Sequence, residues 1–140
     1  MNTFTAFLLL GLISVYGVSA KRQVVKVRGQ LFCPSDPKQA ANVEVKLVDK
    51  DLITGEDEMG KTKTDKDGKF ELSGEENESG SIDPRLKIYH NCDDGYKPGT
   101  RRWKFEFPSK YVNGNGANEY LDLGRMNLEL RLHDEERNFI

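Results

Sequence analysis

The chain is poor in the residues from which most active sites are built. Its 140 residues include only two cysteines, two histidines and one tryptophan, and they contain no Gly-x-Ser-x-Gly motif. Nucleophilic catalysis by serine or cysteine needs a base, usually histidine, that a third group holds in place. A zinc site needs about four well-spaced ligands, or three and a water molecule. We therefore expect no catalytic residues, no metal and no cofactor.

Charge of one sign and long apolar runs are also scarce. The chain has 21 Lys and Arg against 23 Asp and Glu, a net charge of −2. A general nucleic-acid binder is strongly basic, so we expect no nucleic-acid partner. No segment after residue 20 is apolar for the roughly 20 residues that span a bilayer. Residues 21–140 are enough for one domain with one core.

The first 20 residues differ from the rest because they carry no charged side chain. An apolar run, Phe7–Ile13, is followed by the small residues Val18-Ser19-Ala20. This pattern is typical of a secretory signal peptide with its cleavage site. The alternative is a membrane anchor, but the run is short and is followed by glycine and serine. The segment 1–20 therefore predicts export, and a secreted, extracellular protein formed by residues 21–140.

Export changes what the cysteines and one asparagine can do. An even number of cysteines in a secreted chain usually forms disulfides, so Cys33 and Cys92 are predicted to pair. Closing such a loop stabilises a fold by about 4 kcal/mol. The alternative is two free, buried thiols. Asn77-Glu78-Ser79 is an N-glycosylation sequon, and its polar surroundings suggest an exposed loop.

Apolar and polar residues alternate with period two, as they do in half-buried strands. The predicted strands are Val25–Leu31, Val43–Leu47, Phe70–Leu72, Leu86–Ile88, Trp103–Phe107 and Leu128–Leu132, with residues 119–123 as a weaker candidate. Turn residues such as Gly, Asn and Asp separate them. One helical turn is expected at residues 108–112, and no long helical stripe is present. The fold class is therefore all-β, an antiparallel sandwich of seven to eight strands with at most one short helix.

Two motifs have a functional and a structural interpretation. The run Asp65-Lys66-Asp67-Gly68 is similar to the start of a calcium loop, with Glu76 at its twelfth position. Strand-forming residues intervene, so a hairpin turn is favoured. His90 stands beside Cys92 but is in phase with the apolar residues of its strand. A structural histidine at the core is therefore favoured over a metal ligand.

Basic residues gather in one part of the chain. Seven basic residues lie between Arg85 and Lys110, against three acidic ones. Their strands should project several of them outward, which predicts a patch for anionic headgroups or acidic glycans. Its members are Lys87, Arg101, Arg102 and Lys104. The alternative is a solvated strand face whose charges prevent edge aggregation.

Several blocks in this order resemble the nematode transthyretin-like family. The blocks are VRGQLFC at 27–33, NVEVKLVD at 42–49, KTKTDKDGKF at 61–70 and IDPRLKIYHNC at 82–92. The last block is the most specific, and the resemblance runs through most of residues 21–140. The resemblance implies a transthyretin-type (Greek-key, prealbumin-like) sandwich, secretion and no established catalysis.

The resemblance also shapes the expected function. Members typically carry four cysteines, and the two expected near Gly99 and near the C-terminus are absent here, which suggests a looser C-terminal tail. Phosphatidylserine bridging is known within the family. We therefore expect a secreted binding module for an anionic lipid, a glycan or a cell-surface protein, of undetermined oligomeric state. The alternatives are an oligomeric carrier of a small apolar ligand and, least favoured, a hydrolase like the hydroxyisourate hydrolases, whose Tyr-Arg-Gly-Ser tail this chain lacks.

Overall fold

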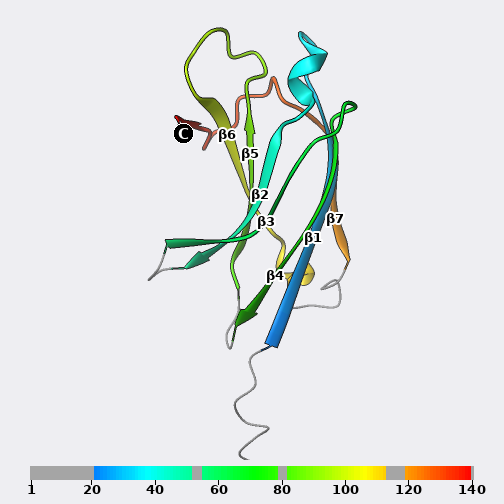
Figure 1. The fold of residues 1–140 in the computed structure, drawn as a ribbon, viewed down its shortest axis with the longest axis vertical. Helices are drawn as coiled ribbons and strands as arrows, with labels where there is room; N and C mark the ends of the chain where they lie inside the picture. Colours follow the sequence, from blue (N-terminus) through cyan, green and yellow to red (C-terminus); the bar gives the residue numbers. More distant parts are fainter. Residues whose placement is uncertain (1–20, 52–54, 79–81, 113–118, 140) are drawn as a thin grey trace, which may run out of the picture.

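The computed structural model describes residues 21–51, 55–78, 82–112 and 119–139, and this part of the chain is all-β (Figure 1). Its strands are β1 (Lys21–Phe32), β2 (Glu44–Asp51), β3 (Gly55–Lys63), β4 (Lys69–Glu78), β5 (Pro84–His90), β6 (Thr100–Glu106), β7 (Tyr120–Asn127) and β8 (Glu136–Asn138). Two short 3-10 helices are η1 (Pro37–Ala40) and η2 (Ser109–Tyr111). The predicted signal peptide, 1–20, lies outside the described residues.

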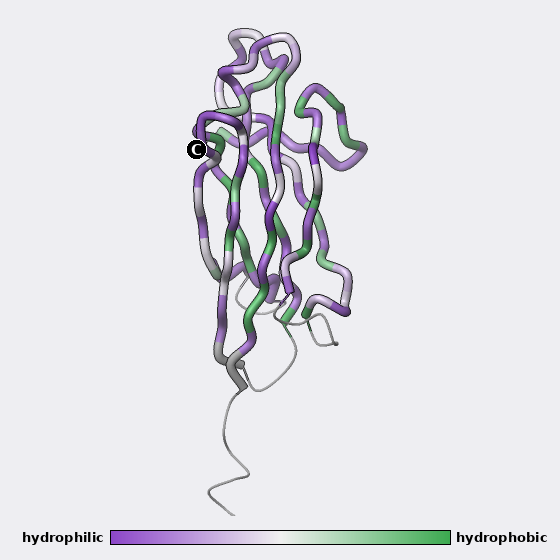
Figure 2. Tube along the Cα trace, turned by 90° about the vertical axis from the view of Figure 1, so that its right-hand side faces the viewer, coloured by the Kyte–Doolittle hydropathy of each residue, from purple (hydrophilic) through white to green (hydrophobic). Residues whose placement is uncertain are grey.

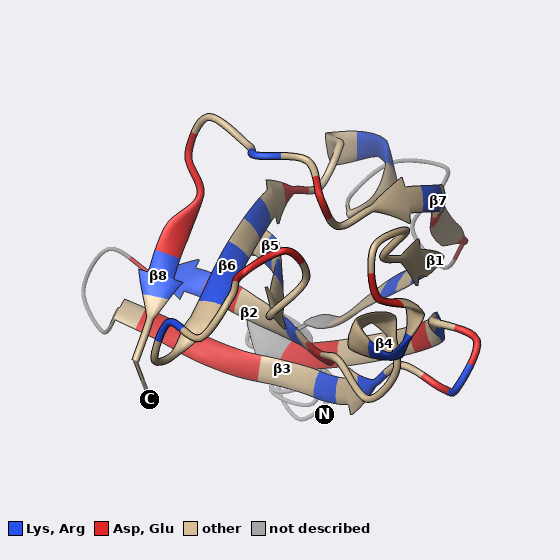
Figure 3. Ribbon diagram, turned by 90° about the horizontal axis from the view of Figure 1, so that it is seen from above, with Lys and Arg blue, Asp and Glu red and all other residues tan. Residues whose placement is uncertain are grey.

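The strands form two sheets that pack as a sandwich. The three-stranded sheet has the order β4-β1-β7, and the five-stranded sheet has the order β3-β2-β5-β6-β8. Figure 3 looks along the strands and shows the two layers facing each other. Every pair is antiparallel except β1 and β7, which run parallel. The sandwich class is confirmed, with one parallel pair that the sequence did not indicate.

Alternation along the strands builds the core, as Figure 2 shows in the changing hydropathy of each trace. Val27 and Leu31 of β1 and Val45 and Leu47 of β2 are fully buried, whereas the residues between them face outward or are half-buried. Trp103 of β6 is the largest of the fully buried side chains within the described residues. Burying each such side chain favours folding by about 1.5–3 kcal/mol, so this pattern fixes which face of each strand is internal.

The turn between β3 and β4 corrects the predicted hairpin. β3 pairs with β2 and β4 pairs with β1, so residues 64–68 carry the chain from one sheet to the other. The Oδ1 atom of Asp65 accepts hydrogen bonds from the backbone N–H groups of Asp67 and Lys69, both at 2.9 Å. Gly68 has a φ of 81°, and a Cβ there would collide with the carbonyl oxygen of Leu31. Asp65 therefore shapes a turn, and glycine is required to finish it.

The end of the chain corrects a second prediction. The weaker candidate at residues 119–123 is the start of β7, whereas the expected strand Leu128–Leu132 is irregular. Leu128 is fully buried but Leu130 is 57% exposed, so these leucines do not share one face of a strand. β3 and β8 were not predicted, since neither has an apolar alternation.

A disulfide joins the sheets at one end. Cys33 follows β1 and Cys92 follows β5, and the two form a bond that closes a loop with a sequence separation of 59. The predicted pairing is confirmed. Near the opposite end, Val25, Ile82 and Val112 form a second apolar cluster. No helix in the described part of the chain has the length and apolarity needed to cross a membrane.

Candidate functional site

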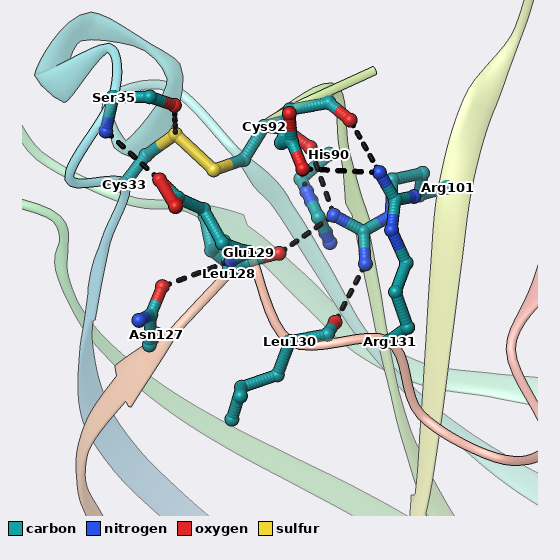
Figure 4. The surroundings of a disulfide bond; sticks show 11 residues. Cys33, Ser35, His90, Cys92, Arg101, Asn127, Leu128, Glu129, Leu130 and Arg131 are labelled. Atoms are coloured by element: carbon teal, nitrogen blue, oxygen red, sulfur yellow. Dashed lines mark hydrogen bonds and ion pairs between the residues drawn. A yellow bond between two sulfur atoms is a disulfide. The ribbon is translucent and has the colours of Figure 1, made fainter.

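Arg101 is not part of any surface patch, although the sequence placed it in one. Its side chain is 1% exposed and points inward from β6 beside the disulfide (Figure 4). Its Nη1 atom donates to the carbonyl oxygens of Cys92 and Leu128 at 2.8 and 2.7 Å, and Nη2 donates to that of Leu130 at 2.6 Å. A buried cation needs such partners to offset its lost hydration. Arg101 therefore organises the loop after β7 and cannot contact a ligand.

A carboxylate completes the environment of Arg101. Glu135 accepts from Nε and Nη2 of Arg101 at 2.9 and 2.6 Å, and it also accepts from Nε1 of Trp103 at 2.8 Å. Burial raises the pKa of Glu135, but hydrogen bonds from Arg101 and Trp103 outweigh burial and hold the pKa below its usual value. Glu135 thus remains ionised at neutral pH, and its bonds to Arg101 fix the loop against β6.

His90 lies in the core beside the same disulfide, as its alternation predicted. Its Nδ1 atom accepts from the backbone N–H of Cys92 at 3.1 Å, and its ring meets Trp103 edge-on with 5.2 Å between ring centroids. Burial, followed by the charge of Arg101, lowers the pKa of His90 to about 4. The ring is therefore neutral at neutral pH. The other histidine, His133, is exposed in the loop before β8.

The other three predicted residues do lie on the outer face of the five-stranded sheet. Lys87 of β5 is 7% exposed and forms an ion pair with Glu56 of β3. The hydrogen bond from Lys87 lowers the pKa of Glu56 despite partial burial. Arg102 forms an ion pair with Glu136 of β8. Lys104 is half-buried and has no ion pair within the described residues.

Register on this face produces a row of lysines. Lys46 of β2 lies opposite both Lys61 of β3 and Lys87 of β5, and Lys87 lies opposite Lys104 of β6. We call Lys61, Lys46, Lys87 and Lys104 the lysine row. Like charges directly opposite each other destabilise a sheet. The row therefore needs counter-charges, which Glu56 supplies to Lys87.

The neighbouring row adds an aromatic ring and further cations. Tyr89 of β5 lies between Glu44 of β2 and Arg102 of β6, and Lys63 of β3 lies opposite Glu44. Lys46 Nζ sits 5.5 Å from the centroid of the Tyr89 ring. Together the two rows and the glutamates paired with them hold six cations and three carboxylates, an excess of three positive charges. Figure 3 shows basic bands on β6 and acidic bands on β3, two strands of the same sheet that β2 and β5 separate.

The sequence contained signals for two of these outcomes. Arg101 is in phase with the inward residues Trp103 and Phe105, so alternation alone places it on the core side. Lys46 alternates with the buried residues Val45 and Leu47, so it had to face outward. Lys46 lies outside the basic segment Arg85–Lys110, so the predicted patch did not include it.

Two clusters of metal-donor atoms occur within the described residues. One joins Cys33 and Cys92 to Glu129, but its sulfurs form the disulfide. The other joins Asp49, Asp57 and Glu76, three carboxylates on three different strands. Glu76 thus lies in a strand and groups with carboxylates other than that of Asp65.

Asn77 lies in β4, opposite Arg22 of β1, and not in the loop that its surroundings suggested. Ser79, the third residue of the sequon, lies outside the described residues. The sequence position stays a predicted glycosylation site at the end of a strand.

Comparison with known proteins agrees with this architecture. The family model described as TTR-52, transthyretin-like family, matches residues 28–108. The chain belongs to the transthyretin-like family. Transthyretin-like protein 5 of Caenorhabditis elegans is 41% identical over 86% of this chain and 87% of its own length. Transthyretin-like proteins 46 and 33 of the same nematode are 39% and 38% identical, over 92% and 83% of this chain and 74% and 81% of their own lengths. Membership of the transthyretin-like family supports a transthyretin-type binding module and indicates no particular ligand.

The tail is held firmly without the two cysteines that the transthyretin-like pattern led us to expect. β8 pairs with β6, so that Thr100 lies opposite Asn138. Arg137 forms an ion pair with Asp94, which is 4% exposed, and donates to the carbonyl oxygen of Pro98 at 2.7 Å. The expectation of a loose tail is therefore wrong, because ion pairs and a short strand hold the tail at the position where a second disulfide was expected.

Proposed function

We propose that this chain is a secreted, extracellular binding module that attaches to anionic lipid headgroups through the outer face of its five-stranded sheet. The lysine row is the observation that carries the proposal. Four lysines in cross-strand register oppose the stability of the sheet, and positions that break a local rule are typical of functional surfaces.

The face suits a membrane better than a small ligand. Two hollows of about 510 and 450 Å³ lie within the described residues, and no member of the lysine row lines either of them. A broad array of cations acts on an extended anionic surface, where each basic residue contributes about 1 kcal/mol. Tyr89 at the centre of the face adds an amphipathic ring of the kind that lies at lipid interfaces.

The test is co-sedimentation of the disulfide-bonded protein with vesicles. We expect binding to vesicles of phosphatidylcholine with 30% phosphatidylserine in roughly 0.05 M salt, and release as added salt shortens the screening length. Replacing Lys46, Arg102 and Lys104 together by Gln removes three cationic contacts with the vesicle surface. The loss of each contact is expected to weaken binding about fivefold.

A matched control keeps the net charge equal. Lys26, Lys38 and Lys110 lie off this face, and their replacement by Gln removes the same three charges. We expect the control variant to bind as the parent does. Equal binding of the parent to neutral and anionic vesicles, or equal losses in the two triple variants, would refute the lipid proposal.

A further inference from the structure

A hollow on the opposite side of the sandwich has a different chemistry. It occupies about 510 Å³ on the outer face of the three-stranded sheet. Ligand sites typically occupy about 300–1,000 Å³, so this hollow is large enough for a small molecule. It shares no residue with the lysine row.

A bulge between β1 and β7 creates the hollow. Arg28 lies opposite Asp122 and Gln30 lies opposite Arg125, so two residues of β7 oppose Gly29 alone. One of the two is Gly124, with a φ of 65° and open space where a Cβ would be. The extra residue reverses the alternation, and Arg125 consequently points outward instead of into the core. Bulges that re-aim a side chain often lie at binding sites.

Two cations flank the same glutamine across the hollow. Lys69 of β4 and Arg125 of β7 lie on either side of Gln30, and neither forms an ion pair within the described residues. Adjacent strands are about 4.8 Å apart, which places the two backbones about 10 Å from each other. A single anionic ester group can therefore be contacted from both sides.

The side chains of Arg125 and Gln30 are already held in place without a ligand. The guanidinium of Arg125 lies 4.6 Å from the centroid of the Phe32 ring, a cation–π contact that restricts its position. The Nε2 atom of Gln30 donates to the carbonyl oxygen of Asp67 at 2.9 Å, which fixes the direction of its amide. Less conformational freedom is then lost when a ligand binds.

Acidic residues line the same hollow and restrict the ligand class. Asp65, Glu71 and Asp122 also line it, and Arg28 pairs with Asp122 at 3.2 Å. Three carboxylates repel a polyanion such as a highly sulfated glycan. They do accept hydrogen bonds from hydroxyl groups. We infer that the hollow binds a sugar carrying one sulfate or phosphate ester, with the ester at Lys69 and Arg125 and the hydroxyls at the carboxylates.

The test is a titration followed by ¹H–¹⁵N NMR, with glucose 6-sulfate and glucose 6-phosphate as probes. We expect chemical-shift changes that saturate below about 10 mM sugar ester and are centred on Gln30 and Arg125. Glucose and inorganic sulfate should cause little change. The stronger of the two probes identifies the ester. No saturation, or equal binding of unsubstituted glucose, would overturn the inference.

Variants separate this site from the lipid face. Arg125→Gln and Lys69→Gln alter exposed side chains, and each should weaken sugar-ester binding about tenfold. Lys104→Gln, on the other sheet, should leave sugar-ester binding unchanged and weaken vesicle binding. Arg125→Gln should leave vesicle binding unchanged. Loss of sugar-ester binding in Lys104→Gln, or none in Arg125→Gln, would contradict the assignment without touching the lipid proposal.

Discussion

Replacing Arg101 by Met is the sharpest test of the structure. Met has a comparable length and no charge, so the substitution removes the donors while filling most of the space. The carbonyl oxygens of Cys92 and Leu128, both fully buried residues, would lose a donor. Each unsatisfied buried group costs about 1–3 kcal/mol. Glu135 would also lose its main counter-charge.

These terms predict a loss of about 3–5 kcal/mol in the free energy of unfolding. That is a large share of the about 5–15 kcal/mol that keeps a typical domain folded. Urea denaturation followed by tryptophan fluorescence measures it directly, because Trp103 is the single tryptophan and shares Glu135 with Arg101.

A neighbouring residue provides the control. Arg102→Met removes an arginine from the same strand, but the ion pair of Arg102 is with Glu136, which is 60% exposed. Pairs at the surface contribute at most about 1 kcal/mol. If Arg101→Met cost no more than Arg102→Met, the proposed role of the buried network would be refuted.

Three further predictions concern stability. Because the pKa of His90 falls from 6.5 in the unfolded chain to about 4 in the folded one, stability should fall by up to about 3 kcal/mol between pH 6.5 and 4. His90→Gln should flatten urea-derived stability across that window, and an unchanged slope would count against the assignment. Replacing Cys33 and Cys92 by Ala opens a loop with a sequence separation of 59 and should cost about 4 kcal/mol, measured by thermal denaturation. Gly68→Ala should lower stability by at least about 2 kcal/mol in the same assay. The control Gly95→Ala, where the space for a Cβ is open, should lower stability by about 1 kcal/mol. Equal losses of stability in the two variants would contradict the steric argument.

Period-two alternation predicted most strands because burial on one side leaves a direct imprint on sequence. Val25–Leu31 and Val43–Leu47 are such cases, and their buried faces are as expected. β3 left no such imprint, since GEDEMGKTK is an edge strand with few inward apolar residues. Leu128–Leu132 alternates without forming a strand. The carbonyl oxygens of Leu128 and Leu130 accept hydrogen bonds from the side chain of Arg101, and Leu130 is exposed.

The candidate sites were less predictable, because they depend on register between strands. Sequence pattern places Lys46 and Lys104 outward, but only the pairing of β2, β5 and β6 puts them in one row. The hollow depends on a single bulge at Gly124, and no local sequence pattern predicts that bulge.

The parallel pairing of β1 with β7 has a consequence for how the chain matures. Lys26 and Tyr120 are partners, yet most of the length of the domain separates them in sequence. During synthesis the N-terminal segments emerge first, so both cysteines are available for oxidation before β7 exists. Until β7 arrives, one edge of β1 exposes a row of unpaired backbone groups, which is the kind of edge that recruits strands of other molecules. The interval before β7 docks is when aggregation of nascent chains is most expected.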